Sequence, residues 1–432
     1  MKRVLIGFLV SLVVFLLWGV PSAQAVTDDE VQSQHIKEAD GTSGQDTNTG
    51  SGIKTGHIQN GAVTNVKIKN ASVGSAKLKN NAVTTAKIAD GAVIPSKIGF
   101  YSNVIIVAPS GGNYTSPVDA MNSITDASAT NPYMVKIMPG VYDIGTDSVQ
   151  MKPYVDIEGS GELTTKITGT VGSSIDPTAG VVNGSDNAEI RFLTVENTGT
   201  GTYKAAIFNN NDSPKITHVT ATASGGDFSY GVWNWGSSPT MTNVTATASG
   251  GTNSNRGVFN MDFSSPTMTN VTATASGGVY SYGVHNENVS SPTMTNVTAT
   301  ASGGVYNYGV QNRFHYSATM TNVTATASGG VYSYGVWNEE SSLMMTNVTA
   351  VGKDGTTNNH GMYNLTTDSE SYTIYVDRSS FEGSTNSICN DTNFTLYIGV
   401  SKLAGGAANA IGTYHCLGAY DETYTALNSS CQ

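Results

Sequence analysis

Charged residues are scarce in this chain of 432 residues, of which Asp, Glu, Lys and Arg together make up 12%. The formal net charge at pH 7 is −11. A protein that binds nucleic acid needs a basic surface, so this composition argues against a nucleic acid as partner. Solubility must depend instead on the hydroxyl and amide groups of Ser, Thr and Asn, which recur throughout the sequence.

Long apolar runs are also missing, except at the N-terminus. There, Lys2 and Arg3 precede the apolar stretch 4–20, and the small-residue sequence Ser-Ala-Gln-Ala follows at 22–25. An uncleaved membrane anchor is one interpretation, because the run approaches the length that spans a bilayer. The Ala-x-Ala ending favours a signal peptide over 1–25 that is cut after Ala25. We therefore expect an exported protein with no membrane insertion after cleavage, located outside the cell, at the cell surface or in the periplasm.

Cysteine is rare, and its three copies all lie in the last tenth of the chain, at Cys389, Cys416 and Cys431. Export permits a disulfide. We expect Cys416 to pair with Cys431 and to close a short C-terminal loop, which leaves Cys389 without an assigned partner. Three cysteines without CxxC spacing or a nearby His cluster do not make a tetrahedral metal site. We expect neither a metal nor a cofactor.

Two segments precede the main domain. Residues 26–51 are polar, with few large apolar residues, and are predicted to form a flexible linker. Over 52–99 a branched apolar residue recurs every five positions, as at Val63, Ile68 and Val73. A period of five fits neither a helix nor a strand, and it suits a chain that turns a corner at each repeat.

This segment, 52–99, is predicted to be a short β-solenoid or a trimeric β-stalk. It resembles the decapeptide repeats in the stalks of bacterial surface proteins and phage tail-fibre proteins. A single chain this thin buries little apolar surface, which favours a homotrimer formed through 52–99.

The strongest pattern is a repeat of 26 residues. The sequence Gly-(Val/Met)-x-Asn occurs six times, with its apolar residue at Val232, Val258, Val284, Val310, Val336 and Met362. A second phrase, Asn-Val-Thr-Ala-Thr-Ala-Ser-Gly-Gly or a close variant, lies between these copies. A fixed period in this range predicts a stacked repeat architecture. We place a repeat domain over 100–400 and a C-terminal cap over 401–432.

Within each repeat, apolar residues alternate with Thr. Met241, Val244 and Ala246 are expected to face inward, and Thr245 outward. Asn243 interrupts the alternation and is expected at a bend, because Asn tolerates the left-handed conformation. Stacked strands bring equivalent amides together, so two hydrogen-bonded ladders are predicted. One ladder contains Asn234, Asn260, Asn286, Asn312, Asn338 and Asn364, and the other contains Asn243, Asn270, Asn296, Asn322 and Asn347.

Short β-rich segments punctuated by Gly, at 135–142, 154–161, 165–169 and 190–197, come before the repeats. Their order resembles the opening coils of the right-handed parallel β-helix superfamily, the pectin-lyase-like proteins. The resemblance implies an all-β fold, a right-handed parallel β-helix of about twelve coils. A short helix over 117–127 is expected to close its N-terminal end.

One outward band changes from copy to copy while the rest of the repeat is conserved among the copies. We predict that this exposed band binds a ligand, because aromatic, polar and charged side chains on a parallel sheet suit stacking on sugar rings. Surface drift without a ligand is the alternative. The candidate residues are Trp233, Trp235, Phe259, His285, Glu287, Arg313, Trp337, Glu339 and Tyr363.

Many pectin-lyase-like proteins cut polysaccharides, so an enzyme must be considered. Glu287 and Glu339 lie two coils apart, or ~9–10 Å by strand spacing. That is close to the separation of the carboxylates in an inverting glycosidase. Arg313 falls between them, however, and a surface ladder of ion pairs is the simpler interpretation. The sequence lacks the Asp clusters and signature motifs of the superfamily's enzymes, and we assign no catalytic residue.

The tyrosines before the repeat glycines, such as Tyr282 and Tyr308, are expected to stack at a corner of the coils. Together these features predict an exported surface or matrix protein that binds carbohydrate or attaches to surfaces. A polysaccharide lyase or glycoside hydrolase is the alternative, and a purely structural spacer is the second alternative.

Overall fold

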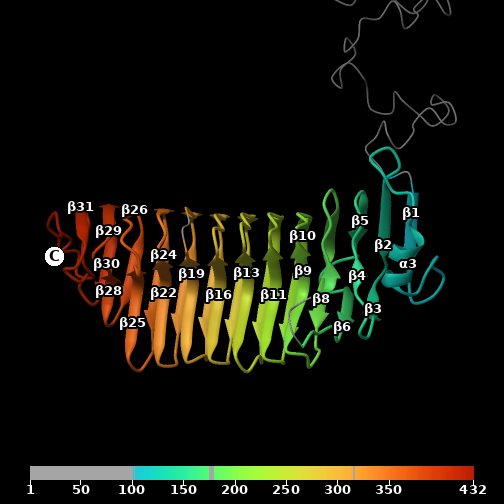
Figure 1. The fold of residues 1–432 in the computed structure, drawn as a ribbon, viewed down its shortest axis with the longest axis horizontal. Coiled ribbons are helices and arrows are strands. Elements are labelled where there is room, and N and C mark those ends of the chain that lie inside the picture. The colour runs from blue at the N-terminus through green and yellow to red at the C-terminus, as the bar shows by residue number, and fades with distance from the viewer. Residues whose placement is uncertain (1–100, 102, 175–179, 315–316) are drawn as a thin grey trace, which may run out of the picture. The chain divides into compact units, whose positions relative to one another are not determined.

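The computed structural model describes residues 101, 103–174, 180–314 and 317–432. The predicted signal peptide, linker and stalk, and with them the predicted trimer contact, lie outside these residues. The described part is a parallel β-helix of about 11 turns with almost no helix, which confirms the predicted fold class (Figure 1).

One side of the β-helix is a parallel sheet of ten strands (Figure 1). Each strand pairs with its counterpart in the next coil, so that equivalent residues of successive repeats lie side by side. The strands are β4 (Val149–Gln150), β7 (Gly180–Asn183), β9 (Tyr203–Asn210), β11 (Phe228–Trp235), β13 (Ser254–Met261), β16 (Tyr280–Glu287), β19 (Tyr306–Arg313), β22 (Tyr332–Glu339), β25 (Asn358–Leu365) and β28 (Asn386–Cys389).

The other 21 strands form a second sheet, which consists of two ladders joined at an angle. In the repeats, the first ladder carries the sequence Thr-Met-Thr. We call it the Thr-Met-Thr ladder; it contains β1 (Asn103–Val107), β2 (Tyr133–Ile137), β5 (Val155–Glu158), β14 (Thr267–Thr269), β17 (Thr293–Thr295), β20 (Thr319–Thr321), β23 (Leu343–Thr346), β26 (Tyr372–Asp377), β29 (Phe394–Gly399) and β31 (Thr413–Leu417).

The second ladder carries the sequence Thr-Ala-Thr in the repeats, and we call it the Thr-Ala-Thr ladder. It contains β3 (Gly140–Asp143), β6 (Thr165–Gly169), β15 (Thr272–Ser276), β18 (Thr298–Ser302), β21 (Thr324–Ser328), β24 (Thr349–Lys353), β27 (Ser380–Gly383) and β30 (Lys402–Gly405). Three longer strands run through both ladders: β8 (Glu189–Asn197), β10 (Lys215–Ser224) and β12 (Thr240–Ser249).

The bend between the ladders contains one residue with a positive φ in each of eight successive coils, from Phe192 to Arg378. In the repeats this residue is Asn, as at Asn243 (φ 54°) and Asn270 (φ 55°), in the left-handed conformation that the sequence predicts. The earlier coils place Phe192 (φ 55°) and His218 (φ 51°) at the same point. Asn is favoured at this position of the repeat because its short polar side chain tolerates the left-handed region of φ/ψ space better than a bulky side chain does.

The core is a stack of identical layers. Met241, Val244 and Ala246 face inward and are at most 1% exposed, as are their counterparts in the next three coils. Val232 and its copies close the core from the ten-stranded sheet. Each layer buries mostly small and branched side chains, so the three sides approach closely.

That close approach explains the glycine of every Gly-(Val/Met)-x-Asn copy. A Cβ on Gly231 would lie 2.6 Å from the carbonyl oxygen of Gly257 and 2.8 Å from the amide nitrogen of Thr247. Both neighbours are backbone atoms and cannot move aside as a side chain could. Gly309 meets the same obstacle, at 2.5 Å from the carbonyl oxygen of Gly335.

Side-chain amides hydrogen-bond from coil to coil in two places. Inside the ten-stranded sheet, Asn234 Nδ2 donates to Asn260 Oδ1 at 2.7 Å, and Asn260 Nδ2 donates to Asn286 Oδ1 at 2.7 Å. This inner ladder stops at Asn312, because Asn312 Nδ2 does not reach Asn338 Oδ1. Asn338 Nδ2 donates to the carbonyl of Ser341, and Asn364 Nδ2 donates to Asn390 Oδ1, so these two predicted members lie outside the ladder. The outer ladder at the bend runs from Asn243 to Asn347, with N···O distances of 2.8–3.0 Å.

A short helix covers the N-terminal end of the β-helix. At the N-terminal end, α3 (Pro117–Ser123) buries Ala120 and Met121 against the first coils, and Ser116 caps it by accepting from the Asp119 amide. The helix is shorter than the predicted 117–127. At the C-terminal end the structure contains the Cys416–Cys431 disulfide, while Cys389 is free.

Candidate functional site

The predicted binding band lies on the outer side of the ten-stranded sheet, as expected, but most of it is not exposed. Trp233, Phe259 and His285 are only 4%, 3% and 2% exposed, and Glu339 is also buried. The prediction of an exposed band is therefore wrong for these four residues. The remaining candidates are partly buried: Trp235, Glu287, Arg313, Trp337 and Tyr363.

The band is covered because its neighbours on the same strands are also large. Tyr230 lies against Trp233, with 4.2 Å between ring centroids, and the ring of Phe259 is 5.4 Å from that of Trp233. The guanidinium of Arg256 lies over Phe259 and over Tyr282, at 4.6 and 5.0 Å from the ring centroids. Outward side chains thus form a second packed layer outside the sheet.

The tyrosine columns belong to the same layer. Tyr282 stacks on Tyr308 at 4.9 Å, and Tyr306 stacks on Tyr332 at 4.7 Å. Stacking was predicted, but these residues lie on the strands β16, β19 and β22 and not at a corner of the coil. Burial raises the pKa of Tyr282 to about 12, so its hydroxyl stays protonated in ordinary conditions.

The charged members of the band form an ion-pair ladder. Arg313 Nε lies 2.8 Å from Glu339 Oε2, and Arg313 Nη1 lies 3.5 Å from Glu287 Oε1. His285 is adjacent, but burial lowers its pKa well below the usual value, and the nearby Arg256 and Arg313 lower it further. A neutral His285 adds no charge, and Glu287 and Glu339 are held by Arg313. This arrangement fits the ion-pair interpretation better than a catalytic pair.

A second charged cluster lies on β2, β5 and β8, near the N-terminal end. Arg191 contacts Glu158 at 2.8 Å and Glu189 at 2.8 Å, and Lys136 contacts Glu158 at 2.7 Å. Burial alone would raise the pKa of Glu158, but its hydrogen bonds to Lys136 and Arg191 lower it. Each carboxylate of this cluster has a cationic partner, which is the pattern of a structural ion-pair network.

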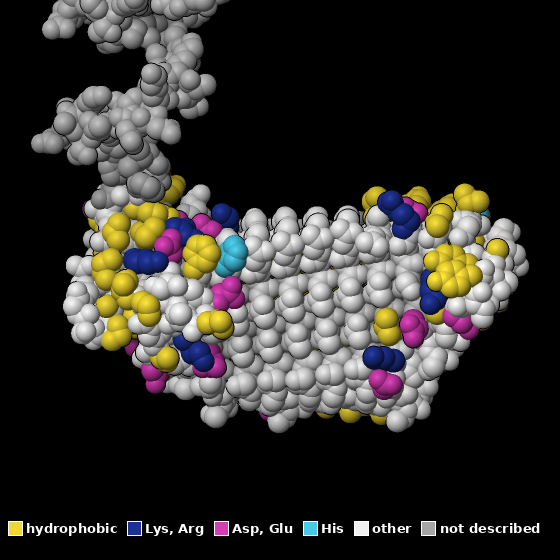
Figure 2. Space-filling model, turned by 180° about the vertical axis from the view of Figure 1, so that it is seen from behind, with side chains coloured by type: hydrophobic (Ala, Val, Ile, Leu, Met, Phe, Trp, Pro, Cys, Tyr) yellow, Lys and Arg dark blue, Asp and Glu magenta, His cyan; other side chains and the backbone are white. Residues whose placement is uncertain are grey.

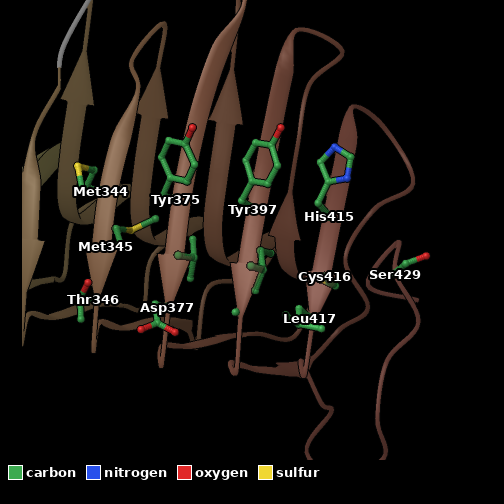
Figure 3. Close-up of a pocket in the computed structure, with 13 residues that line it drawn as sticks. Met344, Met345, Thr346, Tyr375, Asp377, Tyr397, His415, Cys416, Leu417 and Ser429 are labelled. Atoms are coloured by element: carbon green, nitrogen blue, oxygen red, sulfur yellow. The ribbon is translucent and has the colours of Figure 1, made fainter.

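A groove lies elsewhere, on the outer side of the Thr-Met-Thr ladder near the C-terminal end. It is open, has a volume of about 610 Å³, and is formed by the neighbouring strands β23, β26, β29 and β31 (Figure 3). Its principal side chains are Met344, Tyr375, Tyr397, His415 and Leu417.

Strand alternation and register bring these side chains together. In β26, Ile374 and Val376 point into the core, so Tyr375 between them points outward and is 52% exposed. The register pairs Met344 with Tyr375, Tyr375 with Tyr397 and Tyr397 with His415. Tyr375, Tyr397 and His415 therefore form a continuous row across β26, β29 and β31, as Figure 3 shows.

The rings in this row are stacked and accessible. Tyr375 and Tyr397 are 5.3 Å apart with 15° between planes, and Tyr397 and His415 are 4.7 Å apart with 16° between planes. Tyr397 is 43% exposed. The groove contains one carboxylate, Asp377, whose Oδ2 lies 3.0 Å from Nε of its neighbour Arg378. No Lys or Arg is among the residues that line it.

Sequence reasoning missed this groove, although a signal was present. The outward position reads Thr240, Thr267, Thr293 and Thr319 in the repeats, then Met344, Tyr375, Tyr397 and His415. The change from Thr to aromatic residues occurs where the 26-residue period ends. Without a period to align the last coils, the sequence alone does not show that these four residues share a column.

Two further observations bear on chemistry and location. No group of three His, Cys, Asp or Glu side chains that could hold a metal ion occurs among the residues described. In the same part of the chain, no helix has the length and apolar character needed to cross a membrane.

No family model matches the sequence. A segment of 105 residues is 30% identical to a probable pectinesterase/pectinesterase inhibitor of Arabidopsis thaliana, and it covers 23% of this chain and 18% of the plant protein. The comparison therefore spans less than a fifth of that relative.

Solved structures that resemble the chain include carrot pectin methylesterase, at 14% identity over 73% of this chain and 87% of that one, with a TM-score of 0.30. The catalytic domain of a GH87 alpha-1,3-glucanase shares 11% identity over 75% of this chain and 67% of that one, with a TM-score of 0.40. The fold assignment rests on the strand pairing described above and not on these likenesses.

Proposed function

We propose that this chain is an exported carbohydrate-binding β-helix protein, whose binding site is the groove formed by Met344, Tyr375, Tyr397, His415 and Leu417. The observation that carries the proposal is the row of exposed, stacked rings at Tyr375, Tyr397 and His415. Flat, accessible rings on a rigid sheet suit the apolar faces of sugar rings, and they lose little conformational entropy on binding.

The charge of the groove favours a neutral carbohydrate. An acidic polysaccharide would bring carboxylates next to Asp377 and would find no Lys or Arg in the lining to receive them. Arg378 is adjacent but already contacts Asp377. A neutral sugar meets no such repulsion, and its hydroxyls can bond the Asp377 carboxylate and the side chain of Thr346.

Binding is favoured over catalysis because the groove contains a single carboxylate. Glycoside hydrolysis generally uses two carboxylates across the scissile bond, and only Asp377 is present. The partial match to a probable pectinesterase supports polysaccharide as the ligand class, although that match is confined to 23% of the chain. A lyase or hydrolase remains the alternative function, and a purely structural spacer remains the second.

The partly exposed members of the original band are retained as a second candidate contact surface. Trp337 and Tyr363 stack at 4.5 Å and are not fully buried, and Trp235 is also partly accessible. The groove ranks above this surface because its rings are more exposed and because they line a recess in which a ligand can be surrounded.

The test is retention of the mature protein on an array of neutral and acidic glycans. The double variant Tyr375→Ala and Tyr397→Ala should lose at least ten-fold in affinity for every neutral glycan retained, which corresponds to about 1.4 kcal/mol. Tyr424→Ala is the matched control, because Tyr424 is 80% exposed and lies outside the groove. Unchanged retention of the double variant would refute the groove, and loss on Trp337→Ala instead would assign binding to the band.

Reducing-sugar and unsaturated-product assays on the retained polysaccharides decide the enzyme alternative. A binding protein releases no product, whereas product release that disappears in Asp377→Asn would establish catalysis in the groove.

We also propose that the leader directs export and that residues 52–99 hold three copies together, because their apolar row is too thin to be buried by one chain. Light scattering on residues 52–432 and 100–432 tests this. A trimer for the longer chain and a monomer for the shorter one is expected, and a monomer for both would contradict it.

A further inference from the structure

A second surface of the β-helix has a different character from the groove: a regular array of hydroxyls on the outer side of the Thr-Ala-Thr ladder. Four successive strands, β12, β15, β18 and β21, each present Thr, Thr and Ser outward. The array consists of Thr245, Thr247, Ser249, Thr272, Thr274, Ser276, Thr298, Thr300, Ser302, Thr324, Thr326 and Ser328.

The array is periodic in two directions. Along the axis of the β-helix, the register places Thr274 beside Thr300 and Thr300 beside Thr326, so the columns have no offset. Neighbouring strands are ~4.8 Å apart, and alternate residues on one strand are ~6.6 Å apart. Thr is stiff at χ1, so the hydroxyl and methyl groups of one column are expected to share one orientation.

The array carries no charge. Figure 2 shows this side of the molecule, where the repeat coils form a surface without Lys, Arg, Asp, Glu or large apolar side chains between two ends that have them. Two of the three columns end at Val351 and Lys353 in the next coil, and the third continues to Thr349. Among the described residues, none of the twelve hydroxyls has an intramolecular hydrogen-bond partner, so all of them are available to water or to a ligand.

We propose that this threonine array binds the surface of crystalline water. A repeating solid requires a partner that repeats with it, and the ~4.8 Å spacing between the strands of the array is close to the shorter repeat distance between oxygen atoms in ordinary ice. Methyl groups order the water above them, and hydroxyls hydrogen-bond to it at fixed positions. A charged side chain would orient water around itself and interrupt that order.

The rigidity of the fold makes the array effective. The sheet is held by the core and by the outer amide ladder that starts at Asn243, so little freedom is lost on binding. Each hydroxyl contributes little to the binding free energy. Twelve hydroxyls contact the same solid at once, however, and linked contacts raise the overall affinity far above that of one contact. The proposal is independent of the groove, which lies on the other ladder and uses aromatic rings.

The test is thermal hysteresis and partition of the full mature chain into slowly growing ice. We expect measurable hysteresis and enrichment in the ice fraction. The double variant Thr274→Lys and Thr300→Lys places two charges in the central column and should lose at least ten-fold in hysteresis. Thr356→Lys with Thr357→Lys is the matched control, because both are exposed and lie outside the array.

A second variant, Thr298→Tyr, interrupts the array with a bulky residue of good strand propensity. Because Tyr is compatible with the strand, a loss of hysteresis in this variant reports on the array and not on unfolding. Circular dichroism checks that every variant keeps its strands. Exclusion of the unmodified chain from ice overturns the proposal, as does equal activity of the array and control variants. Retention on crystalline polysaccharide that the array variants abolish, without hysteresis, would assign the surface to a different ligand and also overturn it.

Discussion

Outward aromatic side chains on the ten-stranded sheet and on the Thr-Met-Thr ladder differ in what surrounds them. On the ten-stranded sheet, Trp233 lies among Tyr230 and Phe259 and is 4% exposed. On the Thr-Met-Thr ladder, Tyr375 has the small side chains of its own strand beside it and is 52% exposed.

The direction of a side chain and its accessibility are therefore separate properties. Strand alternation determines whether a side chain leaves the core, but the size of its neighbours on the same face determines whether a ligand can reach it. Four large columns next to one another form a second core outside the sheet. A single row of rings above small residues forms a groove.

The largest expected effect is on stability. Trp233→Ala should lower the free energy of unfolding by about 3–5 kcal/mol, because it removes a buried ring from a packed layer. Tyr397→Ala should cost less than about 1 kcal/mol, because much of that side chain already contacts water. Urea denaturation of both variants measures the contrast, and equal losses would erase the distinction between the two surfaces.

A smaller effect is expected in acid. His360 belongs to the packed layer, and burial lowers its pKa to about 4. The unfolded chain binds the proton near the ordinary His value, so stability should be complete above about pH 6.5 and fall by about 2 kcal/mol as the pH approaches 4.5. His360→Tyr introduces the residue found at the register-paired position, Tyr334.

That variant should show a weaker loss of stability between pH 6.5 and 4.5 than the unmodified chain. An unchanged pH profile would mean that His360 is accessible in the folded protein, contrary to its place in the packed layer.

Lengthening the row of rings should increase the affinity of the groove for carbohydrate. Met344 pairs with Tyr375 in the register, so Met344→Tyr would add a ring next to the groove's aromatic row. An added ring contributes about 1 kcal/mol, which predicts roughly a five-fold gain in affinity for the glycans retained. Thr319→Tyr, one strand further from the row, is the control, and equal gains from both would argue against stacking along it.

The smallest effect is expected from the ion-pair ladder. Arg313→Met should change the free energy of unfolding by less than about 1 kcal/mol, because Arg313 and Glu287 are partly solvated. The difference between variant and unmodified chain should shrink further in high salt. A loss of several kcal/mol would show that Glu339 depends on Arg313 for its buried position, which would add electrostatics to the packing of the band.

The fold could be predicted well from the sequence because the length of the repeat determines which residues of neighbouring strands pair. Equivalent residues 26 positions apart must stack, so Val232, Met241 and Asn243 could be assigned to core and bend without a template. The candidate site was harder to predict. The 26-residue period and the strand alternation correctly predicted that Trp233 points outward. They contain no information on how the side chains of Tyr230 and Arg256 pack over their neighbours.

The groove was missed for the opposite reason. Tyr375, Tyr397 and His415 lie 22 and 18 residues apart, outside the 26-residue period, and their common column depends on the lengths of irregular turns. Only the strand register, which pairs Tyr375 with Tyr397 and Tyr397 with His415, brings them together.

Chemical protection of individual tyrosines tests directly whether the groove is the carbohydrate site. The mature protein is iodinated with and without a saturating neutral glycan from the array, and modification at each tyrosine is measured by mass spectrometry. We predict that the glycan protects Tyr375 and Tyr397 at least five-fold and leaves Tyr424 unaffected. Equal modification of Tyr375 and Tyr397 with and without the bound glycan would contradict the assignment of the groove as the carbohydrate site.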